Sequence, residues 1–388
     1  MSDKKVIDLN KFRNKKLAKK IFVFLRIPIV ILVVVAALFL SARLLGNVAV
    51  SNVTDALRQT GEIFRKGGEY PYSTDVSKFR KAASIGSSPL IIYDDSSLVL
   101  SSSANEIFTM PLSYADSKVI TKNGRALVYS NSSNDIILQS KTERLGSISE
   151  EGAVVAATLA KNGYFATSYA AEENQSVLTV YNNRFEKVFQ WNCSQERISD
   201  ISLSSNGKRL AVAAVGAENA EIYTRILVFD IKSSEPLADC KYSGTLFLRI
   251  VYTNSNKVIA AGDNRTVVIT SKGEPVDELV YSEDSILAFC ADDNGNTAVF
   301  YEEFGGAKTG MVRFSSSGKK TCAETLDGNP DCVTAYGGKI AAANGNVITV
   351  YSSSGKVTRT VETENSVSQI FCCSGEIYTI ENSSICKY

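Results

Sequence analysis

The sequence predicts an all-β protein, a seven- or eight-bladed β-propeller preceded by one N-terminal transmembrane helix. From about residue 80, short runs rich in Val, Ile, Tyr and Phe alternate with turns of Ser, Asn, Asp and Gly. These runs recur in groups every roughly 35–45 residues, a period typical of propeller blades. Ahead of them lies the apolar run Ile27–Leu40, which contains no charged or polar side chain.

The apolar run predicts a membrane-spanning helix once its flanks are included. Its 14 residues alone are short, because a helix rises about 1.5 Å per residue and the hydrocarbon core is roughly 30 Å thick. Apolar residues continue on both sides, and Arg26 and Arg43 lie near the ends, where long side chains reach the headgroups. We expect the helix over residues 27–45, or from near residue 21, with the lipid bilayer as its partner.

A basic leader sets the predicted topology. Residues 1–26 hold nine Lys and Arg but only two acidic residues, so the positive-inside rule keeps this tail in the cytoplasm. We expect a single-pass protein of the cell membrane whose C-terminal domain is extracytoplasmic. A cleaved signal peptide is the main alternative, but the leader is long and Leu40-Ser41-Ala42 is a poor cleavage site. The leader could also attract anionic lipid or nucleic acid, although a topology signal explains it.

Composition excludes several functional classes. The net charge of the 388 residues is +1, and removing the leader leaves 33 basic and 39 acidic residues, a net charge of −6. A mildly acidic domain argues against nucleic-acid binding, which depends on phosphate neutralisation. The chain has no histidine, which excludes His-based triads, His general bases and His metal ligands.

All eight cysteines lie beyond the predicted membrane helix. An even number of cysteines outside the membrane can indicate disulfide bonds. The alternative, which we favour for most of them, is a free thiol buried on a strand. No C-x-x-C spacing supports a zinc or redox site. The eight residues are Cys193, Cys240, Cys290, Cys322, Cys332, Cys372, Cys373 and Cys386.

A stalk is expected over residues 46–80, partly helical, followed by the propeller over residues 81–388. Within residues 47–66, apolar side chains fall at roughly helical spacing, and Gly67-Gly68 would end the helix.

The clearest repeat spans Ile198–Tyr242. Its turn Ser204–Lys208 contains an Asn-Gly pair, which is typical of a hairpin between two strands. Four strands joined by such turns are the plan of a propeller blade. The strands are expected at Ile198–Leu203, Arg209–Val215, Arg225–Asp230 and Pro236–Tyr242.

The same plan recurs elsewhere, at Lys118–Gln139, Ala153–Tyr181, Phe247–Ile269, Ile286–Phe314 and Cys332–Val361. Two shorter units bracket the array, Leu90–Met110 at the start and Ser368–Lys387 at the end. The count is seven blades if these units merge and eight if they stay separate, and we slightly prefer seven. Strands from both ends would close the ring and leave no long unpaired edge.

The unit Ile198–Asp230, with an S-x-N-G-K-x-L-A-V core and an I-L-V-F-D strand, resembles WD40-like and quinoprotein-like bacterial repeats. The layout of the whole chain resembles an uncharacterised bacterial family of single-pass, membrane-anchored β-propeller proteins of unknown function. This resemblance implies fold and topology but no functional residue. Phe229-Asp230 replaces the usual Trp-Asp pair, and the sole tryptophan, Trp191, is expected on an outer strand. The tryptophan-docking residues of a quinone-cofactor dehydrogenase are therefore not matched.

Two motifs suggest ligand chemistry, but both are better explained as turns. Asp292–Asn296 (DDNGN) has the oxygen ligands and glycine of a calcium loop, yet it lacks the distal glutamate and occupies a hairpin position. Gly305–Gly310 (GGAKTG) resembles a phosphate loop, but a strand rather than a helix follows it.

Loop residues supply the remaining candidates. Glu172-Glu173-Asn174 and Glu302-Glu303 are acidic loop tips that could bind a cation or a basic partner, although solvated loops explain them. Gly216–Glu221 and Phe304–Thr309 are longer than a tight hairpin requires. If they share a face, we expect them to form a binding rim.

The sequence therefore predicts a membrane-tethered, extracytoplasmic propeller that acts as a non-enzymatic scaffold or sensor and is monomeric. Its partner would be an envelope protein or polymer bound on one face, and a sensor would signal through the short tail. No catalytic, cofactor-binding or metal residue is assigned. The alternative is a propeller lyase or hydrolase that acts on an envelope glycan through carboxylate, Lys and Tyr groups in the central channel.

Overall fold

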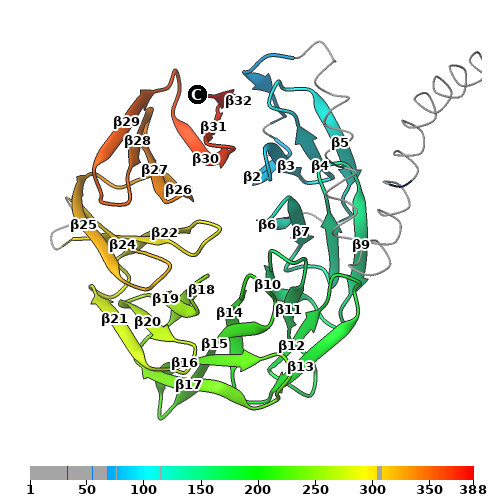
Figure 1. Ribbon diagram of the computed structural model, residues 1–388, viewed down its shortest axis with the longest axis vertical. Coiled ribbons are helices and arrows are strands. Elements are labelled where there is room, and N and C mark those ends of the chain that lie inside the picture. The colour runs from blue at the N-terminus through cyan, green and yellow to red at the C-terminus, as the bar shows by residue number, and fades with distance from the viewer. Residues whose placement is uncertain (1–32, 34–54, 56–67, 76, 114–115, 304–307) are drawn as a thin grey trace, which may run out of the picture. The chain divides into compact units, whose positions relative to one another are not determined.

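The computed structural model describes residues 33, 55, 68–75, 77–113, 116–303 and 308–388. The predicted tail and nearly all of the predicted membrane helix and stalk helix lie outside these residues. Within the described part of the chain, no helix is long and apolar enough to cross a membrane. Residue 55 onward forms one compact unit, an all-β ring (Figure 1).

Eight four-stranded antiparallel sheets form this ring and are numbered here as blades 1–8. Blades 1–4 contain β2 (Phe79–Ile85), β3 (Ser88–Tyr93), β4 (Ser96–Leu100) and β5 (Glu106–Pro111); β6 (Lys118–Lys122), β7 (Arg125–Tyr129), β8 (Asp135–Gln139) and β9 (Arg144–Ser149); β10 (Val154–Leu159), β11 (Phe165–Tyr169), β12 (Ser176–Tyr181) and β13 (Lys187–Cys193); and β14 (Arg197–Leu203), β15 (Arg209–Glu218), β16 (Glu221–Asp230) and β17 (Pro236–Ser243).

Blades 5–8 contain β18 (Phe247–Tyr252), β19 (Lys257–Gly262), β20 (Arg265–Thr270) and β21 (Pro275–Val280); β22 (Ile286–Ala291), β23 (Thr297–Glu302), β24 (Lys308–Phe314) and β25 (Lys320–Asp327); β26 (Cys332–Tyr336), β27 (Lys339–Asn344), β28 (Val347–Tyr351) and β29 (Val357–Glu362); and β30 (Val367–Cys373), β31 (Glu376–Glu381), β32 (Ser384–Lys387) and β1 (Tyr72–Ser73).

The preferred count of seven blades is wrong, because the two end units do not merge. The first unit gains β2 as its innermost strand, and the last unit gains β1 as its outermost strand. The β2 sequence FRKAASI has two cations, Arg80 and Lys81, after its first residue and then three small residues, so it lacks the Val and Ile pattern that marks most other strands. Each end unit is therefore a complete blade.

Closure of the ring by strands from both ends of the domain is confirmed. Tyr72 pairs with Ile385, and the Thr74 N–H donates to the Ser383 carbonyl at 2.7 Å. The first strand of the propeller thus begins at Tyr72 rather than at the expected boundary of residue 81. This pairing covers the edge of β32, which would otherwise be open to solvent.

The connections between strands define two faces of the ring. The AB face carries the turns between the first and second, and between the third and fourth, strands of each blade. The DA face carries the turns between the second and third strands and the connections from one blade to the next. Because every blade repeats the same strand order, all eight inner strands run from the DA face to the AB face.

Neighbouring blades pack their apolar faces together and so form the core. Between blades 3 and 4, for example, Phe229 contacts the rings of Phe189 and Trp191, with centroids 5.6 and 5.2 Å apart. Trp191 lies on the outer strand β13, as predicted. Burial of such alternating apolar side chains holds the blades together.

A bulge lies near the start of six of the eight inner strands, which places an extra residue at the DA end of the channel. The register shifts after Phe79, Val154, Ile198, Phe247, Ile286 and Val367. A bulge re-aims the side chains beside it. The residues at these bulges therefore decide what the central channel presents.

Candidate functional site

The central channel contains a cavity of about 770 Å³ beside the inner strands of blades 1, 2, 6, 7 and 8. Its lining reaches from Lys81 and Gln369, near the DA face, to Gly124 and Gly375 in turns of the AB face. The cavity therefore runs along the full length of the inner strands.

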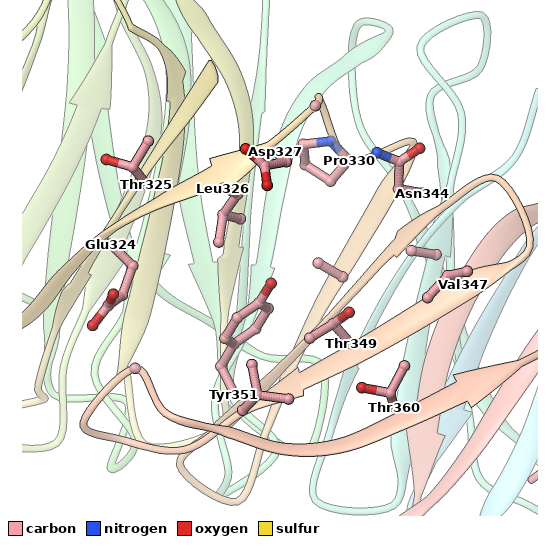
Figure 2. A pocket seen from close by; sticks show the side chains of 15 residues that line it. Glu324, Thr325, Leu326, Asp327, Pro330, Asn344, Val347, Thr349, Tyr351 and Thr360 are labelled. Carbon is pink, nitrogen blue, oxygen red and sulfur yellow. The ribbon is translucent and has the colours of Figure 1, made fainter. Parts of the chain in front are cut away.

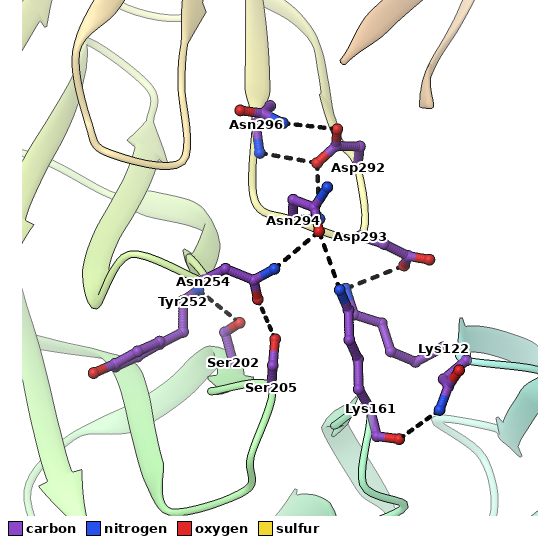
Figure 3. Close-up of polar contacts among 11 residues, drawn as sticks. Lys122, Lys161, Ser202, Ser205, Tyr252, Asn254, Asp292, Asp293, Asn294 and Asn296 are labelled. Carbon is purple, nitrogen blue, oxygen red and sulfur yellow. Dashed lines mark hydrogen bonds and ion pairs between the residues drawn. The ribbon is translucent and has the colours of Figure 1, made fainter. Parts of the chain in front are cut away.

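The turn Asp292–Asn296 of blade 6 contacts side chains of blades 2, 3 and 5 (Figure 3). Lys161 of blade 3 donates to Asn294 Oδ1 at 3.1 Å, and Lys122 of blade 2 lies 3.3 Å from Asp293. Asn254 of blade 5 donates to the same Asn294 oxygen at 2.9 Å. Blades 2 and 6 are opposite each other in an eight-membered ring, so this turn bridges the channel at the AB end.

Hydrogen bonds to Asp292 hold this turn in place. Asp292 accepts hydrogen bonds from the N–H groups of Asn294, Asn296 and Gly338 at 2.9–3.0 Å, and from the Asn296 side chain at 2.9 Å. Its oxygens thus fix a hairpin turn between β22 and β23, the position expected from the sequence. Among the described residues, no group of three Asp, Glu or Cys side chains could hold a metal ion.

Bulge residues bring charge to the DA end of the channel. Gln369 bonds both backbone groups of Ala82 in the next blade, at 2.9 and 2.7 Å. Asp200 occupies the equivalent position in blade 4 and accepts the N–H groups of Ile201 and Ile250 at 3.0 and 2.9 Å. Polar side chains at the bulges therefore tie one inner strand to the next.

Lys81, Lys118 and Arg249 form what we call the inner cation cluster. Lys81 and Arg249 follow the bulges of β2 and β18, and Lys118 begins β6. Burial lowers the pKa of Lys81, and the charges of Arg249 and Lys118 lower it further. Asp200 lies beside this cluster: burial raises its pKa to about 6, although backbone N–H groups and Arg249 oppose the shift.

The raised pKa of Asp200 predicts an unusual pH dependence. Between about pH 4 and 6 the folded protein holds this proton more tightly than the unfolded chain, so ionisation destabilises the fold as the pH rises. Asp200→Asn cannot ionise, and its stability relative to wild type should increase by roughly 2–3 kcal/mol between pH 4 and pH 7. Urea unfolding at pH 4 and pH 7 measures the stability of Asp200→Asn relative to wild type. Loss of the hydrogen-bond acceptor lowers the stability of the variant equally at both pH values. If the stability difference between variant and wild type is the same at both pH values, the raised pKa is ruled out.

The segment Gly216–Glu221 is part of a long hairpin rather than a loop. Gly216 pairs with Tyr223 in β15 and β16, and the turn residues Asn219 and Ala220 have φ of 51° and 65°. A Cβ on Gly216 would lie 2.5 Å from the Tyr223 ring, so the glycine is needed for this contact. The other half of the predicted rim, residues 304–307, lies outside the described part, whereas Lys308 and Thr309 belong to β24.

A cleft of about 690 Å³ lies beside this hairpin. At its base, buried Glu196 accepts hydrogen bonds from Arg225 at 3.0 Å, Tyr223 at 3.1 Å and Cys193 at 3.0 Å. Burial opposes ionisation of Glu196, but these donors lower its pKa. Arg225 also pairs with Asp239, at 2.5 Å. The two cations of this cleft, Arg225 and Lys241, are thus both paired with carboxylates.

A groove of about 610 Å³ separates the outer parts of blades 6 and 7. Tyr351 points into it from β28, close to Leu326 and Thr349 (Figure 2). Glu324 and Asp327 supply the charges of its lining, which includes no Lys or Arg. The groove is suited to an apolar or basic group, in contrast to the cationic end of the channel.

The acidic pairs at the loop tips behave as solvated loops. Glu172 and Glu173 are exposed in the turn between β11 and β12, and Glu302 is exposed at the end of β23. Glu303 accepts a hydrogen bond from Thr325 at 2.9 Å. Both pairs lie on the DA face, but the structure does not bring them together with the channel residues.

All eight cysteines are free, three of them buried and five half-buried, in agreement with the expectation for most of them. Burial raises the pKa of Cys193, and the Glu196 carboxylate raises it further. These thiols are packing residues rather than reactive nucleophiles.

The chain enters the propeller on the AB face. Asp55 accepts hydrogen bonds from Ser140 at 3.0 Å and Thr142 at 2.6 Å in the turn between β8 and β9, and lies 3.3 Å from Arg125. Gly68 donates to Asn105 Oδ1 at 3.0 Å in the turn between β4 and β5. Residues 55 and 68 therefore both contact the AB-face turns of blades 1 and 2.

Sequence reasoning missed Asp55 and the inner cation cluster. The cluster joins residues 81, 118 and 249, which become neighbours only through ring closure and bulges. A signal was present, because a charged residue interrupts the apolar pattern near the start of Phe79–Ile85, Arg197–Leu203 and Phe247–Tyr252.

Comparison with known proteins supports the fold. Residues 68–387 match the model described as "Family of unknown function (DUF5711)". The C-terminal WD40 domain of Sif2 is 11% identical, with 82% of this chain and 98% of that chain covered and a TM-score of 0.59. Sqt1 of Saccharomyces cerevisiae is 11% identical, with 84% and 100% covered and a TM-score of 0.57. No curated protein sequence matched the chain. At these identities the likeness shows a WD40-like propeller and nothing more.

Proposed function

The chain belongs to a family of unknown function, DUF5711, and from its structure we propose that it is a membrane-tethered scaffold that binds a partner on the DA face of its propeller. The partner would be an envelope protein or polymer, and binding would involve no chemical turnover. The propeller is a rigid ring of eight packed blades, so its face can hold loops and strand ends in fixed positions.

The position of the incoming chain is the observation that carries this proposal. Asp55 and Gly68 contact turns of the AB face. The predicted membrane helix over residues 27–45 precedes them closely in sequence, so the AB face would be the one nearer the bilayer. The DA face would then be presented away from the membrane, toward partners in the extracytoplasmic space.

Exposed apolar side chains on the DA face support a binding role. Val155, Leu248 and Leu287 lie at the bulges of three inner strands and are 42%, 43% and 37% exposed. Ile222, next to the tip of the β15–β16 hairpin, is 51% exposed. Exposed apolar residues near one channel mouth are typical of an interaction surface.

A photo-cross-linking amino acid at position 222 would test this function in intact cells with the full chain. The matched control is position 234, an exposed serine in the AB-face turn of the same blade. We expect one dominant cross-linked product from position 222 and none from position 234, and mass spectrometry would identify it. Equal labelling from both positions, or none from either, would contradict binding on the DA face.

One observation favours the enzymatic alternative. Asp200, whose pKa is raised to about 6, lies in the channel close enough to Tyr129 for its charge to raise the pKa of that hydroxyl. A carboxyl group titrating near neutral pH is suited to general acid–base chemistry. Turnover of an envelope glycan by the purified protein, lost in Asp200→Asn and kept in Asp239→Asn, would establish this alternative.

A further inference from the structure

Three cations meet at the DA end of the channel. Lys81 and Arg249 each follow a bulge near the start of an inner strand, in blades 1 and 5, which are opposite each other in the ring. Lys118 begins the inner strand of blade 2. Lys81 is close enough to both for their charges to lower its pKa. The three cations therefore repel one another.

Among the described residues, these cations lack the direct carboxylate partners that other cations of the propeller have. Within the described part of the chain, none of the three makes an ion pair or a side-chain hydrogen bond, whereas Lys122 and Arg225 have carboxylate partners at 3.3 and 2.5 Å. The charge of Arg249 lowers the pKa of Asp200, but backbone N–H groups already donate to both oxygens of this carboxylate. Three cations and one carboxylate leave an excess of positive charge.

Tyr129 adds an unused donor to this region. It is only 7% exposed, and its hydroxyl makes no hydrogen bond to any described residue. Burial raises its pKa to about 12, and the charge of Asp200 raises it while that of Arg249 lowers it. The hydroxyl thus lies near the cluster and stays protonated. The hydroxyl oxygen is not fully buried, so it is open to a ligand or to water in the channel.

We propose that the DA end of the channel is a binding site for an oxyanion group, a phosphate or a carboxylate. Lys81, Lys118 and Arg249 would surround the anion, and the Tyr129 hydroxyl would donate a hydrogen bond to it. An anion relieves the repulsion among the cations and pairs the donor, so one ligand satisfies both observations.

The cavity of about 770 Å³ that begins at Lys81 leaves room for the rest of such a ligand. The oxyanion could belong to a small free molecule or to a phosphate-bearing polymer of the envelope. This inference deepens the proposed function and rests on it for the face from which the ligand enters. The oxyanion group is common to the small molecule and the polymer, and the cations of the channel would recognise it in both.

Calorimetric titration of the full chain in detergent tests the site. The probes are pyrophosphate, which is free and small, and a polyphosphate chain, which represents the polymer. We expect Lys81→Met and Arg249→Met each to weaken binding by at least about tenfold. Lys320→Met, at an exposed position on the outer strand β25, should leave binding unchanged. Tight binding of polyphosphate but not of pyrophosphate would identify a polymer ligand. Equal binding of both probes would identify a small free anion.

Thermal unfolding without ligand provides an independent readout. Lys81→Met removes like-charge repulsion, so its melting temperature should rise, and the increase that pyrophosphate causes in wild type should disappear. Lys118→Gln, at an exposed position, serves if Lys81→Met fails to fold. Absence of binding by both probes, or wild-type affinity in the channel variants, would overturn the oxyanion site. Cross-linking from position 222 would still test the scaffold separately.

Discussion

Replacement of Arg125 by methionine should lower the free energy of unfolding by about 3–5 kcal/mol, the largest effect expected for a single substitution in this propeller. Arg125 is 1% exposed and lies 3.3 Å from the carboxylate of Asp55, which is 6% exposed. Without the guanidinium group, Asp55 would keep a buried negative charge, with the hydroxyls of Ser140 and Thr142 as its remaining hydrogen-bond donors among the described residues.

Urea unfolding of the full chain measures this loss. The matched control is Arg265→Met, because the pair of Arg265 and Glu278 has a similar separation of 3.1 Å but is 32% and 48% exposed. An exposed pair contributes about 0–1 kcal/mol. The double variant Arg125→Met with Asp55→Leu should recover much of the stability, since an apolar pair can replace a buried ion pair.

An effect of Arg125→Met no larger than that of Arg265→Met would show that Asp55 does not remain docked on the propeller. This outcome would also weaken the assignment of the AB face to the membrane side, because Asp55 is one of the two contacts on which that orientation depends. The stability measurement therefore tests the proposed orientation as well as the ion pair.

Repetition made most of the fold predictable. Each complete unit carries an Asn-Gly or similar turn and strands rich in Val and Ile, so local pattern and global architecture agree. The prediction failed where tertiary context replaced the local signal. The sequence FRKAASI forms β2 because it pairs with β3, and β1 is only two residues long. Neither strand is recognisable from its own composition, which explains the preference for seven blades.

The channel site could not be predicted for a different reason. Lys81 and Arg249 are 168 positions apart, and only the eightfold ring places them opposite each other. Asp200 and Gln369 occupy the same bulge position in their blades as Lys81 and Arg249 do in theirs. Asp200 and Gln369 bond a neighbouring strand, whereas Lys81 and Arg249 bond no described residue through their side chains. The sequence shows a polar residue at each of these positions and cannot separate the two kinds.

Substitution of Tyr70 by alanine should lower the free energy of unfolding by about 3 kcal/mol, because this side chain contacts both blade 8 and blade 1, between which the ring closes. Its ring lies edge-on to Tyr378 of blade 8 at 5.3 Å, and its hydroxyl donates to the Ser101 carbonyl of blade 1 at 2.9 Å. Thr74 and Tyr93, joined by a hydrogen bond of 2.7 Å, make a second link between the first strand and blade 1. The first strand thus belongs to blade 8 through its backbone and to blade 1 through its side chains.

Tyr72→Phe is the control, since it removes only an exposed hydrogen bond to Glu106 and should cost about 1 kcal/mol or less. Hydrogen exchange should show that Tyr70→Ala increases opening of β31 and β32 more than that of β15 and β16, on the far side of the ring. Uniform destabilisation would mean that the ring unfolds as one unit and that the first strand is not its closing element. Local opening of β31 and β32 would identify the first strand as the element that closes the ring.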